Sequence, residues 1–136
     1  MRVLALDYGH ARCGVAVSDP TGTLATPLEP VLAAGTRRGL RRVAQVVDEL
    51  GAERVVVGLP VSLSGGDSRQ TRETREFAER LRGVVDVPVE LYDERFTTSL
   101  AAQAGGEAAL DSRAAAVLLD EWLNVGRRSA DRGGKE

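Results

Sequence analysis

Acidic residues stand at three places in the sequence where a carboxylate could serve a metal ion. Asp7 ends an apolar strand, Asp93 and Glu94 end a second one, and Asp111 precedes an alanine-rich stretch. Carboxylates that meet at one edge of a sheet suit Mg²⁺ or Mn²⁺, hard cations that take oxygen ligands and keep bound waters. Two such ions can activate a water and stabilise the leaving oxygen of a phosphodiester. The chemistry indicated is metal-assisted hydrolysis of a nucleic acid, with no need for a general-base histidine.

Asp7 and Asp111 each have a structural alternative. A buried Asp7 needs a partner, and backbone N–H groups of the turn at 9–12 would serve as well as a metal ion. Asp111 could lie in the first turn of a helix or at its N-cap, where the helix dipole favours a negative charge. On a helix, however, Asp111 shares the face of Ala115, which we expect to pack against the sheet. Asp120 points the opposite way and is expected to face solvent.

The segment that contains Asp93 and Glu94 follows a predicted strand over Val87–Tyr92. The carboxyl ends of parallel strands form the edge where such sheets place their sites. The alternative is a solvated strand end that leads into the last helix, with Thr97 or Thr98 as its N-cap.

Arginines are concentrated on one predicted helix, which begins after Thr36 and ends before Gly51. Their spacing of one, four and five residues places them along one side of the helix, where they could bind phosphate or simply be solvated. These arginines are Arg37, Arg38, Arg41 and Arg42. A second group alternates with glutamates and indicates ion pairs within a helix: Arg69, Arg72 and Arg75 with Glu73, Glu76 and Glu79.

Strands and helices alternate in an order that defines the fold class. Three short strands separated by tight turns predict an antiparallel meander, and the later strands are each preceded by a helix. The predicted strands are 2–8, 13–18, 24–31, 54–60 and 87–92, and the predicted helices are 36–50, 68 or 71 to 82, and 99–123 with an interruption at Gly105-Gly106. The order βββαβαβα predicts an α/β protein with the RNase H-like fold, a five-stranded mixed sheet with helices on both faces. Kinases, actin-like ATPases and resolvases share this topology, so it does not define an activity.

Length and composition fit one domain. The 136 residues are 43% hydrophobic but only 4% aromatic, which suits an aliphatic sheet covered by helices and argues against a base-stacking platform. The net charge of −2 gives no overall basic signature, so any nucleic-acid binding must rest on where the arginines lie. Cys13, the one cysteine, is expected to be buried filler. We expect a domain over 1–125 and a disordered tail over 126–136.

The amino-terminal residues show no signal-peptide pattern, and no apolar run approaches membrane-spanning length. We therefore expect a cytoplasmic protein that does not enter membranes.

Four motifs in register resemble proteins of the YqgF (RuvX) family. They are Leu6-Asp7-Tyr8-Gly9 with Arg12, Gly14-Val15-Ala16-Val17-Ser18-Asp19, Val57-Gly58-Leu59-Pro60, and Asp93-Glu94-Arg95-Phe96-Thr97-Thr98. The resemblance extends from Arg2 to about Leu123 and includes Gln70-Thr71 before the second helix.

The resemblance implies a nuclease related to Holliday junction resolvases that trims the 5′ end of precursor 16S rRNA. It implies that Asp7, Glu94 and Asp111 are catalytic and bind Mg²⁺ or Mn²⁺. Resolvase relatives carry an acid on the fourth strand, where this sequence has Gly58, so Glu94 must reach in from the neighbouring strand. The implied partner is nucleic acid, with precursor rRNA favoured over branched DNA, bound by a monomer or weak homodimer. The predicted nucleic-acid contacts are Arg12, Arg37, Arg38, Arg41, Arg42, Arg95, Thr97 and Thr98.

One segment departs from the family pattern. Family members usually carry a longer, basic loop before the aspartate, whereas Ser99–Leu110 here contains no basic residue. A missing basic loop would weaken phosphate contacts and leaves open a ribosome-assembly module that binds RNA without cleaving it. Another alternative, a nucleotide site of the actin or sugar-kinase type, needs a second domain for which this chain has no room.

Overall fold

The computed structural model describes residues 1–59, 69–93 and 107–133, with the backbone alone described for 107–111 and 126–133. Every predicted element that falls in these ranges is present and of the predicted type. The elements are β1 (Val3–Asp7), β2 (Arg12–Ser18), β3 (Ala25–Leu32), α1 (Arg37–Leu50), β4 (Arg54–Leu59), α2 (Arg69–Arg82), β5 (Val89–Asp93) and α4 (Glu107–Gly133).

The five strands form one mixed sheet in the order β3-β2-β1-β4-β5. β1 is antiparallel to β2 and parallel to β4, and β4 is parallel to β5. The parallel strands β1, β4 and β5 therefore end at the same edge of the sheet, which we call the carboxyl edge. This is the topology predicted from the order of elements.

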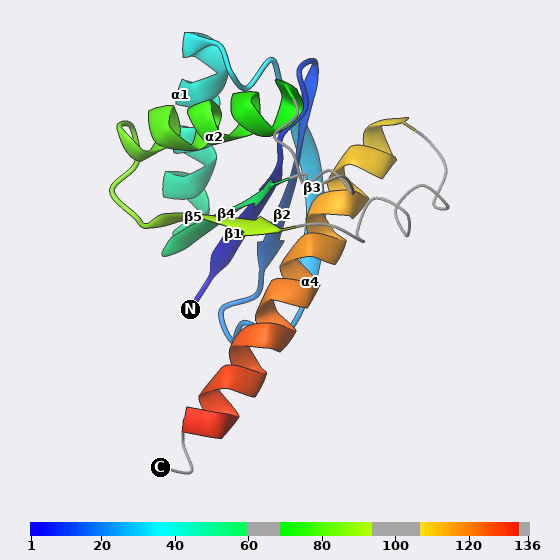
Figure 1. Ribbon diagram of the computed structural model, residues 1–136, viewed down its shortest axis with the longest axis vertical. Helices are drawn as coiled ribbons and strands as arrows, with labels where there is room; N and C mark the ends of the chain where they lie inside the picture. The colour runs from blue at the N-terminus through cyan, green and yellow to red at the C-terminus, as the bar shows by residue number, and fades with distance from the viewer. Residues whose placement is uncertain (60–68, 94–106, 134–136) are drawn as a thin grey trace.

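Helices α1 and α2 cover one face of the sheet (Figure 1). Leu6 and Val57 from the sheet pack there with Val43 of α1 and Phe77 of α2, all at most 2% exposed. α1 begins and ends where its sequence predicts, because the Thr36 hydroxyl accepts from the Gly39 N–H at 3.0 Å and Gly51 adopts a left-handed φ of 65°. We call this side the two-helix face.

Among the described helices, α4 covers the opposite face, which we call the α4 face (Figure 1). The contact combines small and larger side chains: Ala5 and Ala16 of the sheet lie in one buried cluster with Ala115 and Leu118 of the helix. Asp120 is exposed on the outer side of α4, as predicted.

The limits of α4 differ from the predicted helix over 99–123. The described helix begins at Glu107 and continues to Gly133, so the predicted end near Leu123 is wrong. Residues 124–132 contain one glycine and no proline, and a single glycine costs about 1 kcal/mol, which does not break a long helix. The expected disorder of 126–136 concerns motion and stays a prediction. In the described part of the chain, no helix is long and apolar enough to cross a membrane.

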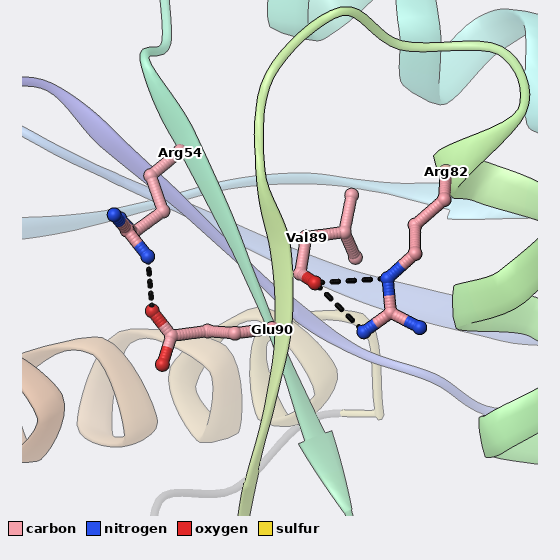
Figure 2. Close-up of polar contacts among 4 residues, drawn as sticks. All are labelled: Arg54, Arg82, Val89 and Glu90. Carbon is pink, nitrogen blue, oxygen red and sulfur yellow. Dashed lines mark hydrogen bonds and ion pairs between the residues drawn. The ribbon is translucent and has the colours of Figure 1, made fainter.

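Strand β5 is held at its start by two arginines (Figure 2). The Arg82 guanidinium, at the end of α2, donates from Nε and Nη2 to the Val89 carbonyl at 3.1 and 2.8 Å. Arg54 of β4 forms an ion pair with Glu90 at 2.8 Å. These contacts fix the strand that leads to the carboxyl edge.

Candidate active site at the carboxyl edge

Asp7 is the last residue of β1 and is partly buried at the carboxyl edge. Side chains alternate along a strand, and Val3 and Ala5 belong to the cluster under α4, so Asp7 belongs to the α4 face. Its partner on β2 is Gly14. The acid therefore lies at the edge where the sequence placed it, on the face that α4 covers.

Glycines stand on both sides of Asp7 in the sheet. On β2 the partner of Asp7 is Gly14, and on β4 the pairing of Leu6 with Val57 puts Gly58 next to Asp7 when the register is continued. Gly58 in turn pairs with Tyr92 of β5. Because glycine has no side chain, the strand positions on either side of Asp7 place no side chain next to its carboxylate.

The first described turns of α4 lie over the row of residues next to Asp7. The Ser112 hydroxyl, on a residue only 4% exposed, donates to the Leu28 carbonyl of β3. Leu28 pairs with Val15, which pairs with Leu6. This contact anchors the residue that follows Asp111 to the part of the sheet that carries Asp7.

Asp111 lies inside α4, because the helix already begins at Glu107. The alternative of an N-cap or first-turn aspartate is therefore wrong. Its helical position is one turn before Ala115 and two before Leu118, both fully buried against the sheet. The side chain of Asp111 lies outside the described residues.

The end of β5 supplies the remaining predicted acids. Asp93 is exposed and pairs with Leu59, while Tyr92 packs into the cluster under α4 and donates from its hydroxyl to Glu121 at 3.3 Å. Burial and the neighbouring Glu121 carboxylate raise the pKa of Tyr92. Glu94 lies outside the described residues, as do Arg95, Thr97 and Thr98.

The described residues test only part of the predicted metal site. They contain no group of three His, Cys, Asp or Glu side chains that could hold a metal ion. They do contain a partly buried carboxylate, Asp7, whose oxygen atoms are the donors that Mg²⁺ and Mn²⁺ prefer. Asp7 therefore fits such an ion, and the contributions of Glu94 and Asp111 stay predictions.

Tyr8 follows Asp7 and packs on the two-helix face. Its ring stacks on Phe77 with centroids 4.5 Å apart, and its hydroxyl lies where a Cβ at Gly35 would approach to 2.5 Å. Burial, followed by the Glu73 carboxylate, raises the pKa of Tyr8. Asp7 at the end of β1 and Tyr8, the residue after it, thus serve the two faces of the sheet, the acid on one and the aromatic ring on the other.

The four arginines of α1 are all exposed, and they divide into two pairs. Arg37 and Arg41 line a hollow of about 430 Å³ between α1 and α2. Arg38 and Arg42 do not, and Arg42 lies 3.8 Å from Glu49 and 3.4 Å from the amide oxygen of Gln45.

Sequence reasoning missed Arg80, which completes this hollow from α2 and donates to the Gly35 carbonyl. Only the crossing of the two helices brings it to α1, so no local signal could have found it. The predicted pairing within α2 is confirmed for Arg69 and Glu73, at 3.1 Å.

The remaining polar residues near the first turns are Asp19, His10, Cys13 and Arg12. Asp19 closes its own turn, because the Thr21 hydroxyl and the Leu24 and Thr23 N–H groups donate to its carboxylate and lower its pKa. His10 is exposed in the loop after β1, and Cys13 is buried, as expected. Arg12 begins β2 at the carboxyl edge, opposite Leu32 of β3.

Solved structures share this fold. Thermus thermophilus RuvC in complex with a Holliday junction substrate matches with a TM-score of 0.61 and 17% identity, covering 93% of this chain and 96% of that one. The fowlpox virus Holliday junction resolvase matches with a TM-score of 0.58 and 12% identity, covering 92% and 99%. The chain thus belongs to the class of proteins with the RNase H-like fold.

Sequence comparison is more specific. The profile of the RuvX family, described as "Holliday junction resolvase", matches residues 1–125. Relatives named "Putative pre-16S rRNA nuclease" include those of Streptomyces coelicolor, 41% identical over 94% of this chain and 83% of its own length, and Chloroflexus aurantiacus, 35% identical over 96% and 91%. The chain belongs to the RuvX family. The predicted family, fold and enzyme class, a nuclease, are confirmed.

Proposed function

We propose that this chain is a metal-dependent nuclease that hydrolyses phosphodiester bonds at the carboxyl edge and processes the 5′ end of pre-16S rRNA. The observation that carries the proposal is Asp7, a partly buried carboxylate at the end of β1, bordered by Gly14 and Gly58 on the face that α4 covers. An acid at this edge fits both the family and the names of the relatives.

Asp7, Glu94 and Asp111 are the proposed ligands and catalytic residues. Asp7 comes from the end of β1, Glu94 from the segment after β5, and Asp111 from α4, which Ser112 ties to the sheet. Gly58 occupies the β4 position beside Asp7, so in this proposal the acid contributed near that position is Glu94. When bound, Mg²⁺ or Mn²⁺ would lower the pKa of a water and offset charge on the phosphate.

The proposed substrate contacts come from both ends of the edge. Arg12 stands at the start of β2, and Arg95, Thr97 and Thr98 follow β5 in the sequence. Arginine binds phosphate in a bidentate way and is suited to hold the backbone across the edge. Because these contacts read phosphate and not bases, they position a strand without selecting its sequence.

A side-by-side cleavage assay tests this function. The full chain is incubated with a precursor rRNA fragment carrying extra nucleotides 5′ of the mature end, and with a four-way DNA junction, each with Mg²⁺, with Mn²⁺ and with chelator. We expect metal-dependent cleavage of the RNA at its 5′ end and none with chelator. Cleavage of the junction alone would show that the substrate is branched DNA and not precursor rRNA. RNA binding without cleavage under every condition would identify a module that assembles ribosomes without catalysis.

A further inference from the structure

The hollow between α1 and α2 is basic on both of its walls. The described residues that line it are Arg37, Leu40, Arg41, Arg80 and Val84, which give it three guanidinium groups and no carboxylate. Its volume of about 430 Å³ is in the range of pockets that hold small ligands. We call it the basic groove.

The three arginines of the basic groove are available to an anion. Within the described part of the chain, no salt bridge involves Arg37, Arg41 or Arg80. Arg80 donates through Nη1 to the Gly35 carbonyl, which holds the guanidinium at the groove. Its other N–H groups can then donate to an anion. By contrast, Arg42 on the same helix lies close to Glu49.

One end of the basic groove adjoins an acidic hollow. Arg41 and Val84 also border the next hollow, of about 530 Å³, but that one contains Asp48 and Asp86. No salt bridge of the described residues involves Asp48 or Asp86, so these carboxylates would repel a polyanion in that direction. Glu73, near Tyr8 at the other end, is paired with Arg69 at 3.1 Å.

The other end of the basic groove leads back to the carboxyl edge. Arg80 contacts Gly35, and Gly35 lies against the Tyr8 hydroxyl, one residue from Asp7. Arg80 is also close enough to act electrostatically on Tyr8. A short path of contacts therefore joins the groove on the two-helix face to the acid on the α4 face.

We propose that the basic groove binds a backbone phosphate of the nucleic-acid substrate on the side of the sheet opposite α4. This inference rests on the proposed function for the identity of the strand, which would pass from the carboxyl edge over Tyr8 to Arg80, Arg37 and Arg41. It divides the arginines of α1, because Arg37 and Arg41 touch the phosphate while Arg38 and Arg42 do not.

Binding measurements on two matched double variants test the division. Arg37→Ala/Arg41→Ala and Arg38→Ala/Arg42→Ala remove the same two charges from the same exposed helix. Both are made in the Asp7→Asn background to prevent cleavage. The probe is a labelled single-stranded RNA, titrated at several salt concentrations, with thermal melts to verify folding. A charge-assisted hydrogen bond contributes enough to binding that we expect the groove variant to weaken affinity on the order of tenfold. Its salt slope should fall by about one, as for one lost phosphate contact.

The control variant should change affinity less than about twofold. Arg80→Gln, which keeps a donor for the Gly35 carbonyl but removes the charge, should weaken binding in the same direction as the groove variant. Equal losses in both double variants would overturn the basic groove and leave a diffuse basic helix face. An unchanged salt slope in the groove variant would overturn it as well.

The outcome is separable from the proposed function. Weaker binding in the groove variants, combined with no cleavage by the parent protein, would support the groove and reject the nuclease. Metal-dependent cleavage by the parent, with unchanged binding in the groove variants, would support the nuclease and reject the basic groove.

Discussion

The two faces of the sheet are built from different residues. On the two-helix face, large side chains such as Phe77, Leu81 and Val43 fill the space beneath α1 and α2. On the α4 face, Ala5 and Ala115 lie in the cluster between one helix and the strands. The first arrangement buries large apolar side chains, and the second packs one helix on the face to which Asp7 belongs. The difference leads us to expect the largest stability effects on the two-helix face and, under the proposed function, the largest activity effects on the α4 face.

The largest effect on stability is expected from Phe77→Ala. Phe77 is 2% exposed and supports the ring of Tyr8, so its removal leaves a cavity and ends the stacking. We expect the free energy of unfolding to fall by about 3–5 kcal/mol, measured by urea denaturation. Val84→Ala, at a side chain 49% exposed, should change it by less than about 0.5 kcal/mol.

If Phe77→Ala does not fold, Phe77→Leu serves in its place, because it keeps most of the volume. A loss from Phe77→Ala that is no larger than that from Val84→Ala would show that the two-helix face does not carry the stability of the domain.

The largest effect on activity is expected from Asp7→Asn on the other face. Replacing a residue that only hydrogen-bonds a metal ligand already lowers metal affinity or activity by about 10–100-fold. Removing the charge of a ligand itself should therefore lower the cleavage rate by roughly a hundredfold or more. Asp111→Asn and Glu94→Gln should act likewise. Stability without metal should hold or rise, because clustered carboxylates repel one another. Cleavage rates and thermal melts with and without Mg²⁺ measure both effects.

Asp120→Asn is the matched control, since Asp120 lies on the exposed side of the same helix as Asp111. It should keep parental cleavage and parental stabilisation by Mg²⁺, which acts through mass action on the folded state. An Asp7→Asn protein that behaves like Asp120→Asn would contradict the active site proposed at the carboxyl edge.

Features of the fold that depend on residues close in sequence were predicted, and a contact between residues far apart in sequence was not. The limits of α1 follow from Thr36 and Gly51, whose hydrogen bonds and backbone angles are local, and both were predicted. The position of Asp7 at the edge follows from strand order and was also predicted. Arg80 was not found, because its contact with Gly35 joins residues 45 apart in sequence and exists only once the helices cross.

The end of α4 was missed for a different reason. Gly126 and the charged residues after it suggest a tail, but without a proline a helix already fixed against the sheet can extend through them. The side of α4 that packs on the sheet was predicted correctly, because the helical spacing of Ala115 and Leu118 places both on one side of the helix, and both are buried.

The smallest effect expected is a gain in stability from Arg38→Glu. Arg38 lies in the first turn of α1, which contains no acidic residue, and there a positive charge opposes the helix dipole. Reversing the charge should raise the free energy of unfolding by about 0.3–1 kcal/mol at low ionic strength. The gain should disappear in high salt, where charges at the surface are screened.

Arg42→Glu is the matched control on the same helix. Residue 42 lies beyond the first turn, and the substitution removes the contact of Arg42 with Glu49, so it should not stabilise the protein. Equal changes in the two variants would mean that the dipole does not act on Arg38. A gain from Arg38→Glu alone would show that the helix dipole at the start of α1 opposes the positive charge of Arg38.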